Sequence, residues 1–234
     1  MKQKRSRQGL GVRRWRRFKS HKRGFYSLII FSILFIFCLG AELISNDKPF
    51  LVYYEGELYG PIFKAYPETT FGGDFETETD YRDPYILDKI VAGDNFAIFP
   101  LNHFSYDTIN LDLDKPVPSP PTKDNLLGTD DRGRDVLARL IYGFRLSVLF
   151  GFALTFVGTT IGILAGSVQG YFGGKTDLFM QRFIEIWGAM PELYLLIIFA
   201  SIFKPGVLLL LILLSMFGWM GLSDYVRAEF LKGR

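Results

Sequence analysis

Residues 146–168 read LSVLFGFALTFVGTTIGILAGSV, a run of 23 residues without a charged side chain. A helix rises about 1.5 Å per residue, so about 20 apolar residues cross a hydrocarbon core about 30 Å thick. Three further apolar blocks of similar length occupy residues 25–44, 183–203 and 206–223. The pattern predicts an all-α membrane protein with four spans and excludes a purely soluble enzyme.

The segment before the first span is strongly basic. Residues 1–24 contain 11 Lys or Arg and no Asp or Glu, and cations beside a span hold that end of the chain in the cytoplasm. A cleaved signal peptide is the alternative, but residues 25–44 exceed the usual ~7–15 apolar residues and no small-x-small site follows. A nucleic-acid-binding arm is a further possibility. We therefore predict a cytoplasmic arm at 1–24 and cytoplasmic segments at 169–182 and 224–234; a location in the bacterial inner membrane is implied by the resemblance described below.

Residues 45–126 then lie outside the cytoplasm. From Ser45 to Arg145 there are 18 Asp or Glu against 10 Lys or Arg. A hairpin is predicted from Phe50–Tyr54, a turn at Glu55-Gly56 and Glu57–Tyr59, and residues 109–113 alternate apolar with polar. We expect a small, mainly β periplasmic cap, followed by a stiff proline-rich tether at residues 116–121.

No catalytic, metal or cofactor site is predicted. The two histidines and the one cysteine lie far apart in the sequence, and the acidic residues of the outer segment lack the calcium-loop pattern. Gly170 to Thr176 resembles a phosphate-binding loop, but Gln169 stands where that pattern requires glycine.

Residues 127–145 lead into the second span and contain apolar residues at helical spacing. They predict an amphipathic helix in the membrane interface, with Thr129 or Asp130 as its N-terminal cap. A generic capped helix is the plainer interpretation. Within the second span, glycines recur every fourth residue, which predicts a face for close helix packing: Gly158, Gly162, Gly166 and Gly170.

The third block contains polar and helix-breaking residues. Pro191 is expected to break or kink the helix, and Glu192 is deep enough to line a translocation path together with Pro191. Glu185 is expected nearer the inner interface.

Residues 127–147 resemble the signature G-T-D-x-x-G-R-D-x-x-[SA]-R…Y-G-x-R-x-S of the C-type membrane subunit of dipeptide and oligopeptide ABC importers. Residues 166–177, Met190-Pro191 and Val226–Leu231 fit the same family. The signature residues are Gly128, Thr129, Asp130, Gly133, Arg134, Asp135 and Arg139. Within the family, Phe71–Phe75, Asp80–Pro84 and Pro118–Pro121 resemble the permeases of Yej-type importers, which carry peptides and the antibiotic microcin C.

The resemblance implies a helical ABC-importer transmembrane domain of six spans. It also implies a second permease subunit, two cytoplasmic ATPases that bind the ATP, and a periplasmic peptide-binding protein. The chain ends at Arg234 with four spans, before the family's cytoplasmic E-A-A loop, as expected for an amino-terminal fragment or an interrupted gene. The chain itself is expected not to be an enzyme. Two other hypotheses remain, a membrane-anchored interaction protein whose outer domain is the working part and an intramembrane enzyme.

Overall fold

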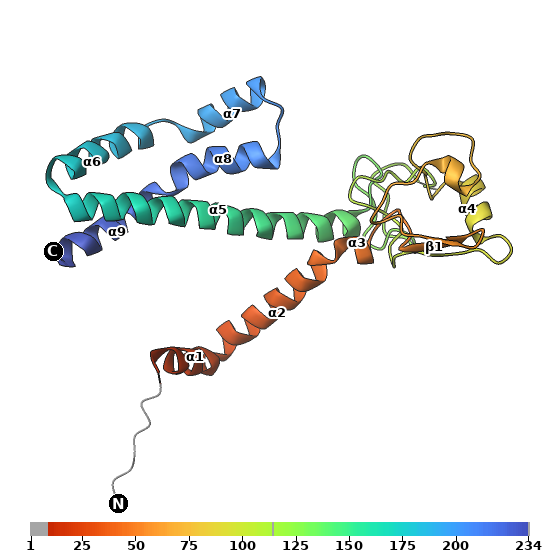
Figure 1. Cartoon of the computed structure of the whole chain (residues 1–234), viewed down its shortest axis with the longest axis horizontal. Coiled ribbons are helices and arrows are strands. Elements are labelled where there is room, and N and C mark those ends of the chain that lie inside the picture. Colours follow the sequence, from red (N-terminus) through yellow and green to blue (C-terminus); the bar gives the residue numbers. More distant parts are fainter. Residues whose placement is uncertain (1–8, 114, 234) are drawn as a thin grey trace, which may run out of the picture. The chain divides into compact units, whose positions relative to one another are not determined.

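The computed structural model describes residues 9–113 and 115–233. The chain divides into two compact units, the first ending at Arg145 and the second beginning at Leu146 (Figure 1). Three described helical segments are long and apolar enough to cross a membrane: Lys22–Leu39, Val136–Phe172 and Val207–Gly233. Counting the bent pair Gly174–Gly188 and Glu192–Ile202 as a single span gives four. The predicted class, a helical membrane protein with a small β-containing insertion, is confirmed.

The first unit begins with two consecutive helices, α1 (Leu10–Ser20) and α2 (Lys22–Leu39). α2 is the first candidate span, and it starts three residues before the predicted boundary at residue 25. Gly40 ends it, and one further turn, α3 (Ala41–Ile44), completes the predicted block 25–44.

The cap contains a three-stranded antiparallel sheet of order β2-β1-β3, formed by β1 (Leu51–Tyr54), β2 (Glu57–Tyr59) and β3 (Phe96–Ile98). The predicted hairpin is confirmed. Its two turn residues, Glu55 and Gly56, both have positive φ, 49° and 91°, as a type I′ turn requires. The alternating residues 109–113 do not form a strand, although Ile109 makes an isolated bridge with Arg134.

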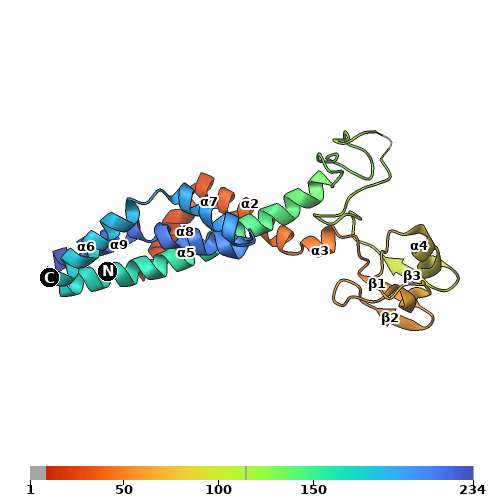
Figure 2. The ribbon, with the colours of Figure 1, turned by 90° about the horizontal axis from the view of Figure 1, so that it is seen from above.

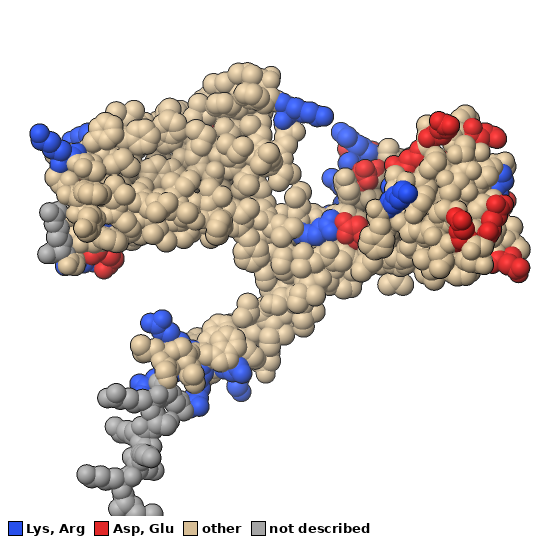
Figure 3. Space-filling view, in the orientation of Figure 1, with Lys and Arg blue, Asp and Glu red and all other residues tan. Residues whose placement is uncertain are grey.

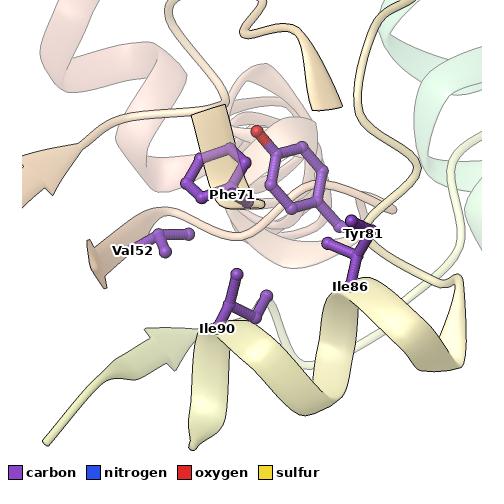
Figure 4. Packing of buried hydrophobic residues seen from close by; sticks show 5 residues of the cluster. All are labelled: Val52, Phe71, Tyr81, Ile86 and Ile90. Carbon is purple, nitrogen blue, oxygen red and sulfur yellow. The ribbon is translucent and has the colours of Figure 1, made fainter. Parts of the chain in front are cut away.

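The core of the cap lies between the sheet and the helix α4 (Pro84–Val91), beside the 3₁₀ turn η1 (Glu68–Phe71). Figure 4 shows its buried side chains: Val52, Phe71, Tyr81, Ile86 and Ile90. Phe71 lies edge-on to four tyrosine rings, with centroid distances of 5.2–6.2 Å. The expected mainly β cap is therefore mixed, because α4 supplies Ile86 and Ile90, two of the three buried aliphatic side chains of this core.

The second unit is entirely helical within its described residues. It contains the larger part of α5 (Val136–Phe172), followed by α6 (Gly174–Gly188), α7 (Glu192–Ile202), α8 (Val207–Gly218) and α9 (Met220–Gly233). In both ribbon views, α6 and α9 lie alongside the carboxyl-terminal part of α5 (Figures 1 and 2).

Three predicted boundaries in this unit differ from the structure. The expected loop at 169–182 is helical except at Gly173, whose positive φ of 62° separates α5 from α6. The expected span 183–203 is two helices bent by 69°, and the break lies just before α7, where Pro191 is positioned to cause it. α9 passes through the boundary expected at residue 223 without interruption.

Candidate functional site: the signature turn and the glycine face

Residues 127–135, here called the signature turn, form a tight loop around one carboxylate. Asp130 accepts hydrogen bonds from the backbone N–H groups of Arg132 and Arg134, each at 2.9 Å. Its other oxygen accepts from the guanidinium of Arg134 at 2.9 Å and from that of Arg139. Burial by itself raises the pKa of Asp130, but these donors outweigh it and hold the pKa well below its usual range.

Both glycines of the signature turn have positive φ, 77° at Gly128 and 79° at Gly133. A Cβ at Gly128 would lie 2.5 Å from the carbonyl oxygen of Ser119. The next residue, Thr129, is hydrogen-bonded to the same serine. Its N–H donates to Ser119 O at 3.0 Å, and its hydroxyl accepts from Ser119 N at 2.9 Å. The turn therefore needs glycine at both positions, and it anchors the proline-rich tether.

Asp135 is completely buried at the end of the signature turn. One carboxylate oxygen accepts from the N–H of Ala138 at 2.7 Å, which caps α5, and also from the amide of Asn102 at 2.9 Å. The other oxygen accepts from the amide of Asn125 at 2.9 Å. Asp135 thus joins three separate segments of the first unit at the start of α5.

The expected helix over 127–145 is corrected by this geometry. α5 begins at Val136, and its cap is Asp135 rather than Thr129 or Asp130. The left-handed conformations of Gly128 and Gly133 cannot continue a helix, so the chain turns until Asp135. From Val136 the helix runs on without a break at residue 145, so residues 127–145 do not form a separate interfacial helix.

The amino-terminal part of α5 is also tied to the end of the first apolar block. Tyr142 donates through its hydroxyl to the carbonyl of Ser45 at 2.8 Å. The Ser45 hydroxyl accepts from Asn102 at 3.0 Å, which connects it to the Asp135 cluster. Arg145 donates to both carboxylate oxygens of Glu42, at 2.7 and 2.8 Å.

The glycine face of α5, formed by Gly158, Gly162, Gly166 and Gly170, lies against residues 218–230. A Cβ at Gly166 would lie 2.5 Å from the carbonyl oxygen of Ser223 and 2.8 Å from the Cβ of Val226. A Cβ at Gly162 would lie 3.0 Å from the carbonyl oxygen of Trp219. The absence of side chains on this face lets the backbones of α5 and α9 approach closely.

A polar cluster beside the glycine face was not anticipated from the sequence. Gln169 is completely buried and donates to the hydroxyl of Ser223 at 2.8 Å, while its carbonyl oxygen accepts from Gln181 at 3.0 Å. Arg227 of α9 donates to both carboxylate oxygens of Asp177 on α6. The sequence does contain a signal for this cluster, because polar residues recur near the ends of the apolar helices. Each such polar residue needs a partner inside a membrane protein.

The two expected path residues lie at the break between α6 and α7. Pro191 directly precedes α7, and Glu192 occupies its first turn with a half-buried side chain. The end of α6 is held to α8, since the indole of Trp187 donates to Met216 O at 3.1 Å and stacks on Phe217. Glu185 pairs with Arg182 at 2.5 Å on the exposed face of α6.

The cap has an open cavity of about 640 Å³ with mostly charged walls. Its two cations are paired, Lys48 with Glu78 and Arg82 with Asp112, the latter at 3.8 Å. Among residues 9–113 and 115–233, no three His, Cys, Asp or Glu side chains are grouped to hold a metal ion. Figure 3 shows acidic side chains gathered over the cap on the face in view.

Two family descriptions match the chain. Residues 158–234 match the inner-membrane component of binding-protein-dependent transport systems. Residues 9–61 match the amino-terminal transmembrane domain of oligopeptide transport permease C. The matches include α1, α2 and the hairpin at one end, and the whole glycine face with α6–α9 at the other.

Individual relatives agree with these matches. The chain is 48% identical over 221 residues to the inner membrane ABC transporter permease protein YejE of Escherichia coli, an alignment that covers 94% of this chain and 64% of the relative. It is 46% identical to the peptidoglycan transport system permease protein YejE of Agrobacterium fabrum, with 95% and 64% covered. The oligopeptide transport system permease protein OppC of Haemophilus influenzae is 39% identical over 46% of this chain and 35% of its own length.

The chain thus spans 64% of the length of each of its two YejE relatives. Its apolar helices and these relatives together indicate a multi-pass inner-membrane protein. The chain is thus similar to the inner-membrane permeases of binding-protein-dependent transport systems, and among them to oligopeptide transport permease C.

Proposed function

We propose that the chain is part of a permease subunit of a bacterial ABC importer that translocates peptides across the inner membrane. The main support for this proposal is the 48% identity to a permease over 94% of the chain, because this alignment includes the cap as well as the helices. The names of its relatives refer to transport of peptidoglycan, oligopeptides and dipeptides. Peptide antibiotics such as microcin C belong to the same proposed substrate class.

The amino terminus is proposed to be cytoplasmic, which makes the cap periplasmic. The 11 cations of residues 1–24 support this orientation, since no acidic residue offsets them. The acidic, charge-paired cap then faces the compartment from which peptides arrive.

The partners proposed are a second permease, two cytoplasmic ATPases that bind the ATP, and a periplasmic peptide-binding protein. The family's dependence on a binding protein supports the last of these. In this scheme α5 and α9 move as one body, because the glycine face and the Gln169–Ser223 bond lock them together. Motion started by the ATPases would then open the path alternately to each side of the membrane.

Pro191 and Glu192 are proposed to line the path. A broken helix leaves backbone groups without intrahelical partners, and membrane proteins place such breaks where they line a cavity. Glu192 begins α7 with a half-buried carboxylate, which suits interaction with a charged or polar peptide.

The test is peptide uptake in the host organism. Deleting the gene is expected to abolish uptake of a radiolabelled tripeptide, and the full-length gene supplied in trans is expected to restore it. Glu192→Gln should lower uptake with normal membrane insertion, whereas Glu185→Gln, which alters an exposed carboxylate paired with Arg182, should not. Unchanged uptake after deletion, or failure of the purified complex to contain ATPase subunits, would overturn the proposal.

A further inference from the structure

The described segment before the first span contains the helix α1, whose side chains are exposed except for the half-buried Phe18. α1 has no buried residue, and the side chains of Leu10, Val12 and Trp15 are each more than half exposed. His21, with the non-helical backbone angles φ −81° and ψ 75°, separates it from α2. The helix axis changes direction between α1 and α2 (Figure 1).

α1 is amphipathic in a specific way. Gly11, Trp15 and Phe18 lie at i, i+4 and i+7 and therefore share one face. The rings of Trp15 and Phe18 stack at 5.7 Å, and Phe18 contacts Phe25 of α2 at 6.2 Å. The aromatic face of α1 is thus continuous with the apolar surface of the membrane-spanning helix.

Outside the aromatic face, α1 is rich in Lys and Arg, and Leu10 and Val12 are also exposed there. Seven Lys or Arg occur between residues 9 and 24, and no acidic residue occurs before Glu42. Figure 3 shows these Lys and Arg side chains gathered around α1 without any acidic side chain among them. No ion pair within the described residues involves these cations, so their charge is available to an external anion.

We propose that α1 is an anionic-phospholipid-binding helix, which lies in the membrane interface with Trp15 and Phe18 among the acyl chains and its arginines on lipid phosphates. A short helix with an aromatic face and a cationic face has the chemistry of such an interfacial element. The attachment to α2 favours a lipid over another anionic partner, since the span holds α1 within reach of the headgroups. The inference requires only that α2 crosses the membrane, so it stands or falls separately from peptide transport.

The experiment uses the full chain in bilayer nanodiscs with a nitroxide label at one of two positions. In a Cys38→Ala background, Gly11→Cys reports the aromatic face, and Ser20→Cys, nine residues away, reports the opposite face. Neither change removes a cation or an aromatic ring, and Gly11 has open space around it. The accessibility of each label to oxygen and to a water-soluble nickel chelate gives its depth.

With phosphatidylglycerol in the bilayer, the residue-11 label should be reached by oxygen and shielded from nickel, and the residue-20 label should show the reverse. In pure phosphatidylcholine the difference should shrink, as it should when salt is raised from about 0.1 M to about 1 M, where the screening length falls from about 10 Å to about 3 Å. Replacing Arg13, Arg14, Arg16 and Arg17 by Gln should remove the dependence on phosphatidylglycerol.

Equal nickel accessibility of both labels in both bilayers would overturn the proposal, because α1 would then lie in water. Immobilisation of the residue-20 label by a DNA duplex, with the residue-11 label still accessible to nickel, would overturn it in favour of nucleic-acid binding. A depth that is unaffected by phosphatidylglycerol and by the loss of the four arginines would contradict its anionic specificity.

Discussion

The guanidinium of Arg145 and the carboxylate of Glu42 form a two-point ion pair, with N–O distances of 2.7 and 2.8 Å. The pair joins the first turn after α2 to the amino-terminal part of α5, which are 103 residues apart in the sequence. Tyr142 lies beside it, with its ring centroid 5.1 Å from the guanidinium carbon of Arg145. The ion pair therefore connects α3 to α5 directly, although the two helices are distant in the sequence.

Breaking the Glu42–Arg145 ion pair is expected to lower the stability of the protein, and the effects of the two substitutions should not be additive. Glu42→Gln and Arg145→Gln should each lower the thermal midpoint of the detergent-solubilised protein, and the double variant should lose less than the sum. We expect a coupling free energy of about 1 kcal/mol, because the Glu42 side chain is 40% exposed and solvent screens part of the attraction. The same cycle on Arg182 and Glu185, which are 74% and 56% exposed, should give a coupling near zero. Equal coupling in both pairs would contradict the geometry.

Asp135→Asn is expected to destabilise the start of α5 strongly. The amide that replaces one carboxylate oxygen would meet the donor of Asn125, or those of Asn102 and Ala138, and leave buried donors without acceptors. The expected cost is about 2 kcal/mol in unfolding free energy, measured by chemical denaturation in detergent. Asp131→Asn, an exposed neighbour, should change stability by less than about 0.5 kcal/mol. Similar losses in the two variants would show that the buried cluster is not what stabilises this region.

Asp130 makes the stability of the signature turn dependent on pH. Its pKa in the folded protein lies below the ordinary value of about 4, so its stabilising effect is complete at pH values above that and is lost as the pH falls toward the folded-state pKa. The gap in thermal midpoint between wild type and Asp130→Asn should therefore be constant from pH 7 to about pH 5 and narrow below about pH 4. A gap that widens on acidification would mean that Asp130 is not held ionised by its donors.

Gly166→Ala is expected to force α5 and α9 apart. The added Cβ would lie 2.5 Å from Ser223 O, which is backbone and cannot move independently. Overpacking of this kind costs about 1–3 kcal/mol. Gly151→Ala on the same helix is the matched control, because nothing lies within 4 Å of its Cβ position and alanine favours helix by about 1 kcal/mol over glycine. The thermal midpoint should fall in the first variant and be unchanged or rise in the second.

Local sequence was sufficient for features that depend on neighbouring residues. The apolar blocks identify the spans, Glu55-Gly56 identifies the hairpin turn, and the four-residue glycine spacing identifies the face of α5 that another helix approaches. Each depends on a period or a backbone preference that is complete within a few residues. The break before α7 is of the same kind, since proline cannot donate a helical hydrogen bond.

Only the tertiary structure decided which polar residues act together. Asp130 and Thr129 are as good helix caps as Asp135 in isolation, and the choice of Asp135 depends on amides from Asn102 and Asn125. The sequence around Gln169 likewise does not indicate its partner, because Ser223 of α9 is 54 residues away. Hydropathy and helical period determined that this protein is a bundle of membrane helices with a small cap. The position at which α5 starts and the polar contact between α5 and α9 were decided by long-range hydrogen bonds, because a buried polar group takes its partner from whichever segment packs against it.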